Sequence, residues 1–374
     1  MNLRLASQSL AMPLALAGIC AFFALREPAF LGSRNLTQLF VEFSITGTLA
    51  LGMFMILLTG QIDLSVGSGV GLIGGIAAVL VFQHGWPAPA AMALAFMAAL
   101  ALWSAMGALI VRQRIPSFII TLGGLLIFKG LFWLVIGNST IPVSRGDAEN
   151  LYSRLTTYYL PASAGLGLAG VVLLALGTLA WRSRAARRAH GLPVRPALQT
   201  AALWFATALG TLGLVALCNG FRGVPLSLPI LASTAGIVYF LTQHTPFGRY
   251  LYAIGGNEEA AHLSGIAVQR VTIGAFALMG IAVALTGFMT TAYSGASTTT
   301  VGDLMELDAI AACVIGGTAL KGGRGTVLGV IFGALIMTAL LNGMTLLAVS
   351  PESKFIARGA VLTLAVWMDV KLRR

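Results

Sequence analysis

Long apolar runs separated by short polar stretches dominate the chain. A helix that crosses a lipid bilayer needs about 20 apolar residues. The runs predict helices at approximately residues 11–25, 36–59, 65–83, 88–111, 117–137, 161–181, 198–218, 228–243, 271–292, 308–320, 326–348 and 354–370. Because several runs are short or interrupted by glycine, the pattern predicts about ten to twelve transmembrane or re-entrant helices. We therefore expect a single all-α polytopic membrane domain over residues 1–374.

The composition excludes the soluble and the disordered classes. Only 9% of the 374 residues are charged and 57% are hydrophobic, whereas a soluble globular chain carries about 25% charged residues. Disordered chains combine low hydrophobicity with high charge. The apolar excess must therefore face lipid. The cysteines, Cys20, Cys218 and Cys313, lie far apart in or beside apolar runs without CxxC spacing, which is typical of small packing residues.

The basic residues predict the orientation of the chain in the membrane, because loops retained in the cytoplasm carry an excess of Lys and Arg. With the N-terminus inside and alternating crossings, 15 of the 23 basic residues fall on the cytoplasmic side. Six fall outside, and Lys129 and Arg358 lie within apolar runs. We expect both termini in the cytoplasm, a periplasmic loop at 138–160, an Arg-rich cytoplasmic loop at 182–197 and a cytoplasmic loop at 244–270.

The chain lacks the motifs of common enzyme and nucleotide-binding classes. None of its four lysines lies in GxxxxGK[ST], so there is no P-loop to hold ATP. The four histidines are scattered and show no paired metal-ligand spacing. The net charge is +11, but the basic residues lie in short stretches between apolar runs. No soluble basic domain therefore presents this charge to nucleic acid. We expect no catalytic residue, no metal site and no cofactor in this chain.

The loop at 244–270 predicts a short helix. Gly255 and Gly256 break the chain, and Asn257 is a good N-cap for a helix that begins at Glu258. Glu258 and Glu259 then lie in the first turn, where negative charge meets the positive helix end. Gly265 suits a left-handed stop. A helix of about two turns is unstable alone in water, so it must pack against its own bundle or against another protein.

An acidic residue follows the second apolar run. In LTGQIDLSVGSGVGL (58–72), Asp63 lies beside Ser65 at a break flanked by glycines. An acid at membrane depth is costly and functional by default, which favours a residue that lines a transport pathway. The alternative is that Asp63 caps the following helix at the interface, where the cost is small. Asp63 is the sole candidate that we identify for an ionisable group inside a span.

A second broken element is predicted in ELDAIAACVIGGTALKGGRGTVLGVIFGALI (306–336). Glu306 and Asp308 precede an apolar run and either cap it or line a pathway or gate. The glycine pairs at 316–317 and 322–323 indicate a broken or re-entrant backbone. Irregular backbone at membrane depth survives only where it is buried in protein or lines a water-filled path. Asn342 lies inside a later run, where it bonds either a neighbouring helix or a substrate.

Several of these stretches resemble the sugar-transport permeases of ATP-binding-cassette (ABC) importers, the ribose, galactose and xylose class. Glu259-Ala260-Ala261-x-x-x-Gly265 resembles the EAA-type coupling loop within FGRYLYAIGGNEEAAHLSGI. Residues 58–72 resemble the family's GGIDLSVG pattern, with a departure at Gln61, and residues 306–336 resemble ELDAIAA…GGTSL, with Ala319 in place of Ser. The resemblance covers most of the chain, is strongest over 245–370, and is closest to the D-xylose branch in the loops at 138–160, 182–195 and 222–225.

The resemblance implies an all-helical permease of the bacterial inner membrane that forms half of a homodimeric pore. It implies two copies of a separate ATPase subunit below and a periplasmic sugar-binding protein above, with D-xylose as the expected sugar. ATPase coupling would fall on Gly256, Asn257, Glu258, Glu259, Ala260, Ala261 and Gly265. The candidates for the substrate pathway or gate are Asp63, Ser65, Glu306, Asp308 and Asn342.

Three alternatives stay open at this stage. A secondary transporter driven by protons or sodium would usually place ionisable groups inside its spans. A permease of the same family would serve another solute, such as ribose, another pentose, a branched-chain amino acid or a nucleoside. The helix after Asn257 would, in the simplest alternative, be an interfacial amphipathic helix without a partner.

Overall fold

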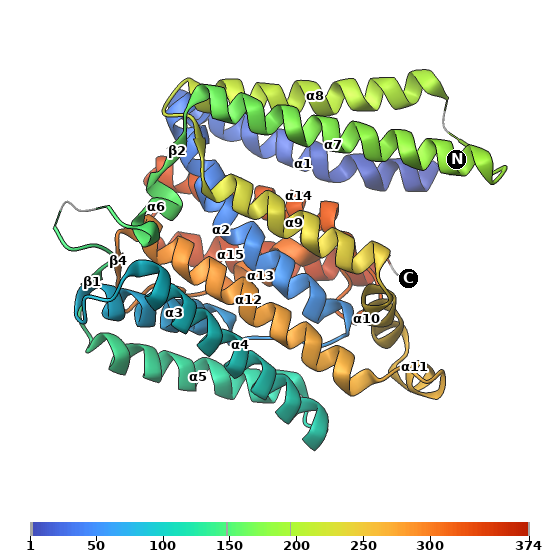
Figure 1. Cartoon of the computed structure of the whole chain (residues 1–374). Coiled ribbons are helices and arrows are strands. Elements are labelled where there is room, and N and C mark those ends of the chain that lie inside the picture. The colour runs from blue at the N-terminus through green and yellow to red at the C-terminus, as the bar shows by residue number, and fades with distance from the viewer. Residues whose placement is uncertain (1–2, 147–148, 195, 373–374) are drawn as a thin grey trace.

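The computed structural model describes residues 3–146, 149–194 and 196–372, with side chains described from 12 to 367 within these ranges and at 371. The helices are α1 (Leu3–Arg26), η1 (Pro28–Leu31), α2 (Ser33–Leu58), α3 (Val66–Phe82), α4 (Ala88–Gln113), α5 (Ser117–Ile136), α6 (Leu151–Thr157), α7 (Ala162–Ala189), α8 (Ala197–Asn219), α9 (Ser227–His244), α10 (Pro246–Gly256), α11 (Glu258–Leu263), α12 (Val268–Ser294), α13 (Met305–Ile315), α14 (Val327–Leu346) and α15 (Pro351–Leu372). Most of the long helices run side by side between two ends of the molecule (Figure 1).

The two ends differ in structure. At one end, which we call the strand end, four short strands pair antiparallel: β1 (Ile141–Pro142) with β4 (Ala296–Ser297), and β2 (Tyr159–Leu160) with β3 (Val224–Pro225). The helix α6 lies at this end, and Asn150 begins it with a capping box to Ser153. The opposite end, which we call the α11 end, carries α10, α11 and the turn between α7 and α8 (Figure 1).

Three of the long helices are largely buried. Of the 18 most apolar consecutive residues in each helix, 89% are buried in α2 and 67% in both α12 and α14, against 17% in α7 and α8. Small residues allow the central helices to approach closely. A Cβ atom added to Gly287 of α12 would lie 2.7 Å from the carbonyl oxygen of Val70 in α3, so only glycine permits this distance. The core therefore lies around α2, α12 and α14, and α7 and α8 lie at the periphery.

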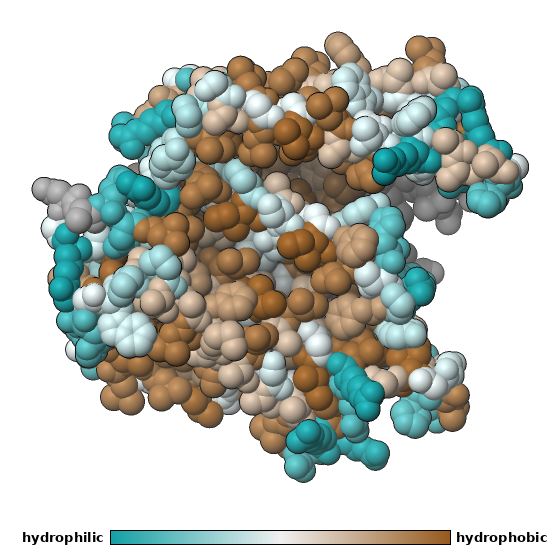
Figure 2. All heavy atoms as spheres, in the orientation of Figure 1, coloured by the Kyte–Doolittle hydropathy of each residue, from teal (hydrophilic) through white to brown (hydrophobic). Residues whose placement is uncertain are grey.

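The flanks of the molecule are apolar, as expected for contact with lipid. Figure 2 shows hydrophobic residues over the sides of the bundle and hydrophilic residues gathered toward its two ends. Among the described residues, seven helices are long and apolar enough to cross a membrane: α2, α4, α5, α7, α8, α12 and α14. The predicted all-α polytopic fold is confirmed, and the number of crossings, about ten to twelve, stays a prediction.

Each of the twelve predicted apolar runs corresponds to a helix. Three details differ. The loop at 244–270 contains a helix that the sequence did not predict, α10, and Gly255 and Gly256 form its last turn instead of a break. The run predicted at 308–320 is helical only to Ile315. The loop at 138–160 contains α6 and two short strands.

Candidate functional site

Two irregular segments meet inside the bundle. The first, residues 59–65, connects the end of α2 to the start of α3, and the second, residues 316–326, connects α13 to α14. The backbone N–H of Gly323 donates to the carbonyl oxygen of Leu58 at 3.0 Å. A Cβ atom on Gly60 would lie 3.1 Å from the carbonyl oxygen of Lys321. The two segments are therefore in direct backbone contact.

The end of α10 completes this contact. A Cβ atom on Gly322 would lie 2.7 Å both from the Cα of Gly255 and from the backbone nitrogen of Gly60, and one on Gly323 would lie 2.8 Å from the nitrogen of Gly256. Real Cβ atoms are not found so close to backbone atoms. We call the four residues Gly60, Gly255, Gly322 and Gly323 the glycine junction. It joins α10 to both irregular segments through backbone contacts alone.

A hydrogen bond also ties α10 to the second irregular segment. The hydroxyl of Tyr252 in α10 donates to the carbonyl oxygen of Gly325 at 3.0 Å. Burial raises the pKa of the Tyr252 phenol above its ordinary value, so the hydroxyl keeps its proton at neutral pH. Together with the glycine junction, this bond makes α10 and residues 316–326 neighbours along several residues.

The helix α11 has the start and the end predicted from its sequence. The side chain of Asn257 accepts a hydrogen bond from the backbone N–H of Ala260 at 2.9 Å, and Gly265 adopts a left-handed conformation with φ of 81°. Ala261 is buried, whereas Glu258 and Glu259 are exposed and Leu263 is 81% exposed. The helix lies at one end of the molecule, beside α10 (Figure 1). Its acidic first turn and an exposed leucine are therefore available to another protein.

Asp63 is fully buried and holds three hydrogen bonds. It accepts from the backbone N–H and the hydroxyl of Ser65, at 2.8 and 2.6 Å, and from the indole N–H of Trp103 in α4 at 2.7 Å. The N-cap residue of α3 is Ser65, whose own side chain makes no cap hydrogen bond. Asp63 lies two residues earlier and accepts the N–H of Ser65, so Asp63 is not the N-cap residue that one of the two hypotheses made it. Its carboxylate fixes the bend between the first irregular segment and α3.

The side chains of α5 satisfy the backbone of the first irregular segment. The backbone N–H of Ile62 donates to the hydroxyl oxygen of Ser117 at 3.1 Å, and the hydroxyl of Thr121 donates to the carbonyl oxygen of Ile62 at 3.2 Å. Buried backbone groups outside helices need such partners. The segment is thus held by both α4 and α5.

We expect the replacement of Asp63 by alanine to lower the free energy of unfolding by about 3 kcal/mol, because it leaves the donors of Ser65 and Trp103 buried without an acceptor. The measurement is the thermal unfolding midpoint of the purified protein in detergent. The control is Glu149→Ala, which removes a 59%-exposed carboxylate whose bridge to Arg154 contributes about 1 kcal/mol or less. Equal midpoints for the two variants would contradict the bracing role of Asp63.

Glu306 and Asp308 lie in the first turn of α13. The N-cap residue is Leu304, in a left-handed conformation with φ of 62°, and its own side chain makes no cap hydrogen bond. Both acids are buried, with 8% and 7% of their surface exposed. Asp308 forms an ion pair with Arg358 of α15 at 3.0 Å. Glu306 lies against the start of α3, where a Cβ atom on Gly67 would lie 3.2 Å from its carboxyl carbon. Asp308 therefore pairs with α15 instead of capping α13, whereas Glu306 lies between the first turn of α13 and the start of α3.

Asn342 belongs to a polar network between α2, α12 and α14. Its side-chain oxygen accepts from Asn35 at 3.0 Å, and its amide donates to Glu42 at 3.4 Å. The other carboxylate oxygen of Glu42 accepts from the hydroxyl of Tyr293 at 2.9 Å. The sequence analysis overlooked Glu42, although an acid inside the run at 36–59 is itself a signal. Asp63 is therefore not the sole ionisable group inside a span.

The basic residues found within apolar runs also have acidic partners. Lys129 of α5 forms an ion pair with Asp303, in the segment that precedes α13, and donates to the carbonyl oxygen of Thr299 at 2.9 Å. Its ammonium group lies 5.5 Å from the centre of the Trp133 ring. Arg358 pairs with Asp308, as described above. Charged side chains inside a bundle are stabilised by such pairing.

The predicted site residues therefore do not converge on one point. Asp63, Ser65 and Glu306 gather around the start of α3, Asp308 pairs with α15, and Asn342 lies in the network with Glu42. Among the described residues, no group of three or more His, Cys, Asp or Glu side chains is arranged to hold a metal ion.

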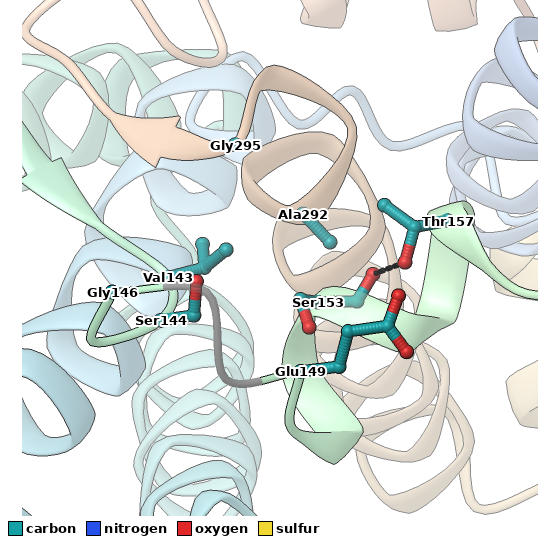
Figure 3. Close-up of a pocket in the computed structure, with 8 residues that line it drawn as sticks. All are labelled: Val143, Ser144, Gly146, Glu149, Ser153, Thr157, Ala292 and Gly295. Atoms are coloured by element: carbon teal, nitrogen blue, oxygen red, sulfur yellow. Dashed lines mark hydrogen bonds between the residues drawn. The ribbon is translucent and has the colours of Figure 1, made fainter.

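A cavity of about 260 Å³ opens at the strand end (Figure 3). It is lined by Val143, Ser144, Gly146, Glu149, Ser153, Thr157, Ala292 and Gly295. The lining comes from the segment before α6, from α6 itself and from the end of α12, and Thr157 donates to the carbonyl oxygen of Ser153 at 3.0 Å. Hydroxyl groups and one carboxylate give this surface a polar, hydrogen-bonding character.

Comparison with known proteins identifies close relatives. Residues 35–366 match the family described as "Branched-chain amino acid transport system / permease component". The chain is 40% identical to the xylose transport system permease protein XylH of Escherichia coli K12, over 98% of this chain and 93% of that protein. It is 39% identical to XylH of Haemophilus influenzae, over 97% and 96% of the two chains. It is 32% identical to the ribose import permease protein RbsC of Escherichia coli K12, over 96% and 92%. No solved structure matches the chain.

Proposed function

The chain belongs to the permease-component family of branched-chain amino acid transport systems, and from this premise we propose that it is the membrane permease of an ABC importer for D-xylose. The observation that carries the sugar assignment is the 40% identity to a xylose permease over 98% of the chain, compared with 32% for a ribose permease. Both relatives align over nearly their whole lengths, so the likeness extends beyond one shared motif.

In this proposal the chain works with three kinds of partner. ATP hydrolysis takes place on a separate ATPase subunit, a periplasmic binding protein delivers the sugar, and a second copy of the chain completes the pore. The acidic and exposed surface of α11 is the contact for the ATPase, through Asn257, Glu258, Glu259, Ala260 and Gly265. Gly256 ends α10, and the buried Ala261 packs α11 on the rest of the bundle. The polar cavity at the strand end, beside the loop at 138–160, faces the binding protein.

The position of α11 supports the proposed orientation in the bacterial inner membrane. The first turn of α1 and the last turn of α15 lie toward the same end of the molecule as α11 (Figure 1). If α11 meets a cytoplasmic ATPase, both ends of the chain are cytoplasmic as well. The excess of basic residues in the loops at that end agrees with this arrangement.

We infer that movement passes from α11 to the transport route through α10. The glycine junction joins the last turn of α10 to residues 59–65 and 316–326 without flexible side chains between them. These irregular segments are the parts of the bundle whose backbone is free to change without breaking a helix. A shift of α10 therefore alters both segments together. The ATP-bound and ATP-free states of the ATPase would then select between outward-facing and inward-facing arrangements of the permease.

The polar residues of the bundle receive different roles in this proposal. Asp63 and Ser65 brace the first irregular segment, which forms one wall of the route. Glu306 lies against the start of α3, and Asp308 pairs with Arg358 of α15. Both residues therefore position α13, the helix that precedes the second irregular segment. Asn342, with Glu42, offers hydrogen bonds of the kind that sugar hydroxyl groups exchange.

Uptake of labelled D-xylose tests the function. Cells that lack the chain are compared with cells that receive it on a plasmid, with and without an uncoupler of the proton gradient. We expect the plasmid to restore uptake, and the uptake to persist with the uncoupler while cellular ATP is maintained. Collapse of uptake with the uncoupler at constant ATP would instead indicate an ion-driven transporter. If the plasmid restores uptake of ribose, galactose or arabinose but not of xylose, the assignment as an ABC permease stands and the assignment of D-xylose as its substrate is overturned.

A further inference from the structure

Among the described residues, the hairpin formed by α7 and α8 is buried against the rest of the molecule only in its half near the strand end. Its buried residues all lie in the half of the hairpin that is nearer to the strand end: Gly165, Ala169, Leu173, Ala208, Val215 and Cys218. Part of this half packs on Val224 in a small apolar cluster. Over 174–189 and 197–207, no described residue is buried. The half that points toward the α11 end therefore stands away from the bundle, and its exposed leucines and tryptophans face lipid.

The helix α7 is longer than the bilayer requires. Its 28 residues correspond to about 42 Å at about 1.5 Å per residue, whereas the hydrocarbon core is about 30 Å thick. Trp181, which is 71% exposed, lies about 20 residues from the start of the helix, where tryptophan is favoured at the membrane interface. The last two turns of α7 thus extend into the headgroup region.

These last turns and the following connection are strongly basic. The segment 182–195 contains Arg182, Arg184, Arg187, Arg188 and Arg195 and no acidic residue, which gives a formal charge of +5. The nearest acidic residues along the chain are Glu149 and Glu258. In Figure 2 the hairpin is hydrophobic along its side and hydrophilic at its tip. A cluster of arginines at the cytoplasmic edge of a span attracts anionic lipid headgroups.

The tip also contains a cavity between the two helices. Its volume is about 390 Å³, and it is lined by Ala180, Ser183, Arg184, Arg187, Pro193, Val194 and Thr200. A guanidinium N–H of Arg184 donates to the hydroxyl oxygen of Thr200 at 3.0 Å, and the Nε–H of Arg187 donates to the carbonyl oxygen of Pro193 at 3.2 Å. A guanidinium has five N–H donors. Within the described part of the chain, Arg187 uses one of them, in the bond to Pro193, which orients the group and leaves donors for a ligand.

We propose that this cavity binds the phosphate of an anionic phospholipid. Two oriented guanidinium groups match the geometry and the charge of a phosphate diester. The apolar residues Ala180, Pro193 and Val194 and the lipid-facing sides of α7 and α8 suit the glycerol and acyl chains of the same molecule. A bound lipid would fill the space beside the half of the hairpin that no other part of the described chain covers.

Lipid binding to the purified full-length protein tests the proposal. A fluorescent phosphatidylglycerol is titrated into detergent-solubilised protein, and fluorescent phosphatidylcholine serves as the neutral comparison. We expect phosphatidylglycerol to bind more tightly than phosphatidylcholine. The double variant Arg184→Gln/Arg187→Gln should bind it roughly 30-fold more weakly than the parent, since each interfacial arginine contributes about fivefold. The matched control, Arg112→Gln/Arg114→Gln at the end of α4, should bind the lipid like the unchanged protein.

The outcomes separate the alternatives. Equal binding of the two lipids, or equal loss in the control variant, would overturn the site and leave the arginines as topology signals only. Displacement of phosphatidylglycerol by inorganic phosphate at a similar concentration would overturn the lipid assignment in favour of free phosphate. A variant that keeps its lipid and loses the ATPase would assign the arginines to protein contact instead. The charge-preserving variant Arg184→Lys/Arg187→Lys should bind the lipid more tightly than the glutamine variant and more weakly than the parent, because it keeps the charge and loses the guanidinium geometry.

Discussion

Replacement of Gly255 by alanine should reduce D-xylose uptake by roughly tenfold or more while the ATPase subunit still binds the permease. The added methyl group would overlap the carbonyl oxygen of Leu58 and the backbone nitrogen of Gly323, and would lie 2.9 Å from the carbonyl carbon of Gly322. Because all three neighbours are backbone atoms, the strain is relieved only by separation of α10 from the irregular segments. The measurements are labelled uptake in cells and co-purification of the ATPase from membranes.

The neighbouring residue provides a matched control. A methyl group on Gly256 meets nothing within 4 Å, and the backbone there is helical. Gly256→Ala should therefore fold, bind the ATPase and transport like the parent protein. If Gly255→Ala also transports normally, the glycine junction does not carry the movement of α10. If both variants lose uptake equally, the loss belongs to the loop in general and not to the junction.

The junction also shows where sequence reasoning reached its limit. Gly255 and Gly256 look like a chain break because glycine disfavours helix interiors. In the structure they end a helix. Gly255 is needed there because the backbone of Gly322 and Gly323, far later in the chain, approaches it closely. The start of α10 had a local signal, since Thr245 precedes Pro246 and caps Gly248 with its hydroxyl. The local signal for its start was therefore present but overlooked, and the local signal for its end was misleading.

The long helices were predictable because a lipid environment imposes their length and apolarity. All twelve runs became helices, and the N-cap Asn257 and the left-handed Gly265 of α11 followed from short-range rules. The partners of buried charges were not predictable in this way. Glu42 and Asn342 lie 300 positions apart in the sequence, and Lys129 and Asp303 lie 174 apart. No spacing rule connects residues across such distances.

Glu306 and Asp308 illustrate the same limit. Their place before an apolar run left both helix capping and the lining of a pathway open, and capping is decided by the nearest few residues. The structure instead gives each acid a tertiary contact: Asp308 with Arg358 and Glu306 with the glycine face of α3 at Gly67. Both contacts hold α13 against other helices directly before the second irregular segment. For a chain whose proposed movement occurs in irregular segments, such contacts are expected to contribute to function as well as to stability.

Simultaneous replacement of Glu259 by lysine and Gly265 by valine should lower D-xylose uptake to the level of cells that lack the chain, with unchanged amounts of permease in the membrane. Lysine reverses the charge of an exposed residue in the first turn of α11. A positive charge there is unfavourable because the start of a helix is itself positive. Valine at Gly265 is strained because φ is 81°, so the helix loses its stop. Unlike Gly255→Ala, this variant should also lose the ATPase in co-purification, because it alters the contact surface itself.

The control is Glu352→Lys, which reverses an exposed glutamate in the first turn of α15, at the far end of α14 from α10. It changes the same kind of residue by the same charge, and uptake should stay near that of the parent. Normal uptake by the Glu259 and Gly265 double variant would show that α11 is not the ATPase contact. Loss of uptake with the ATPase still bound would move the role of α11 from docking to transmission of movement. The two variants together therefore separate attachment of the ATPase, at α11, from transfer of its movement, at the glycine junction.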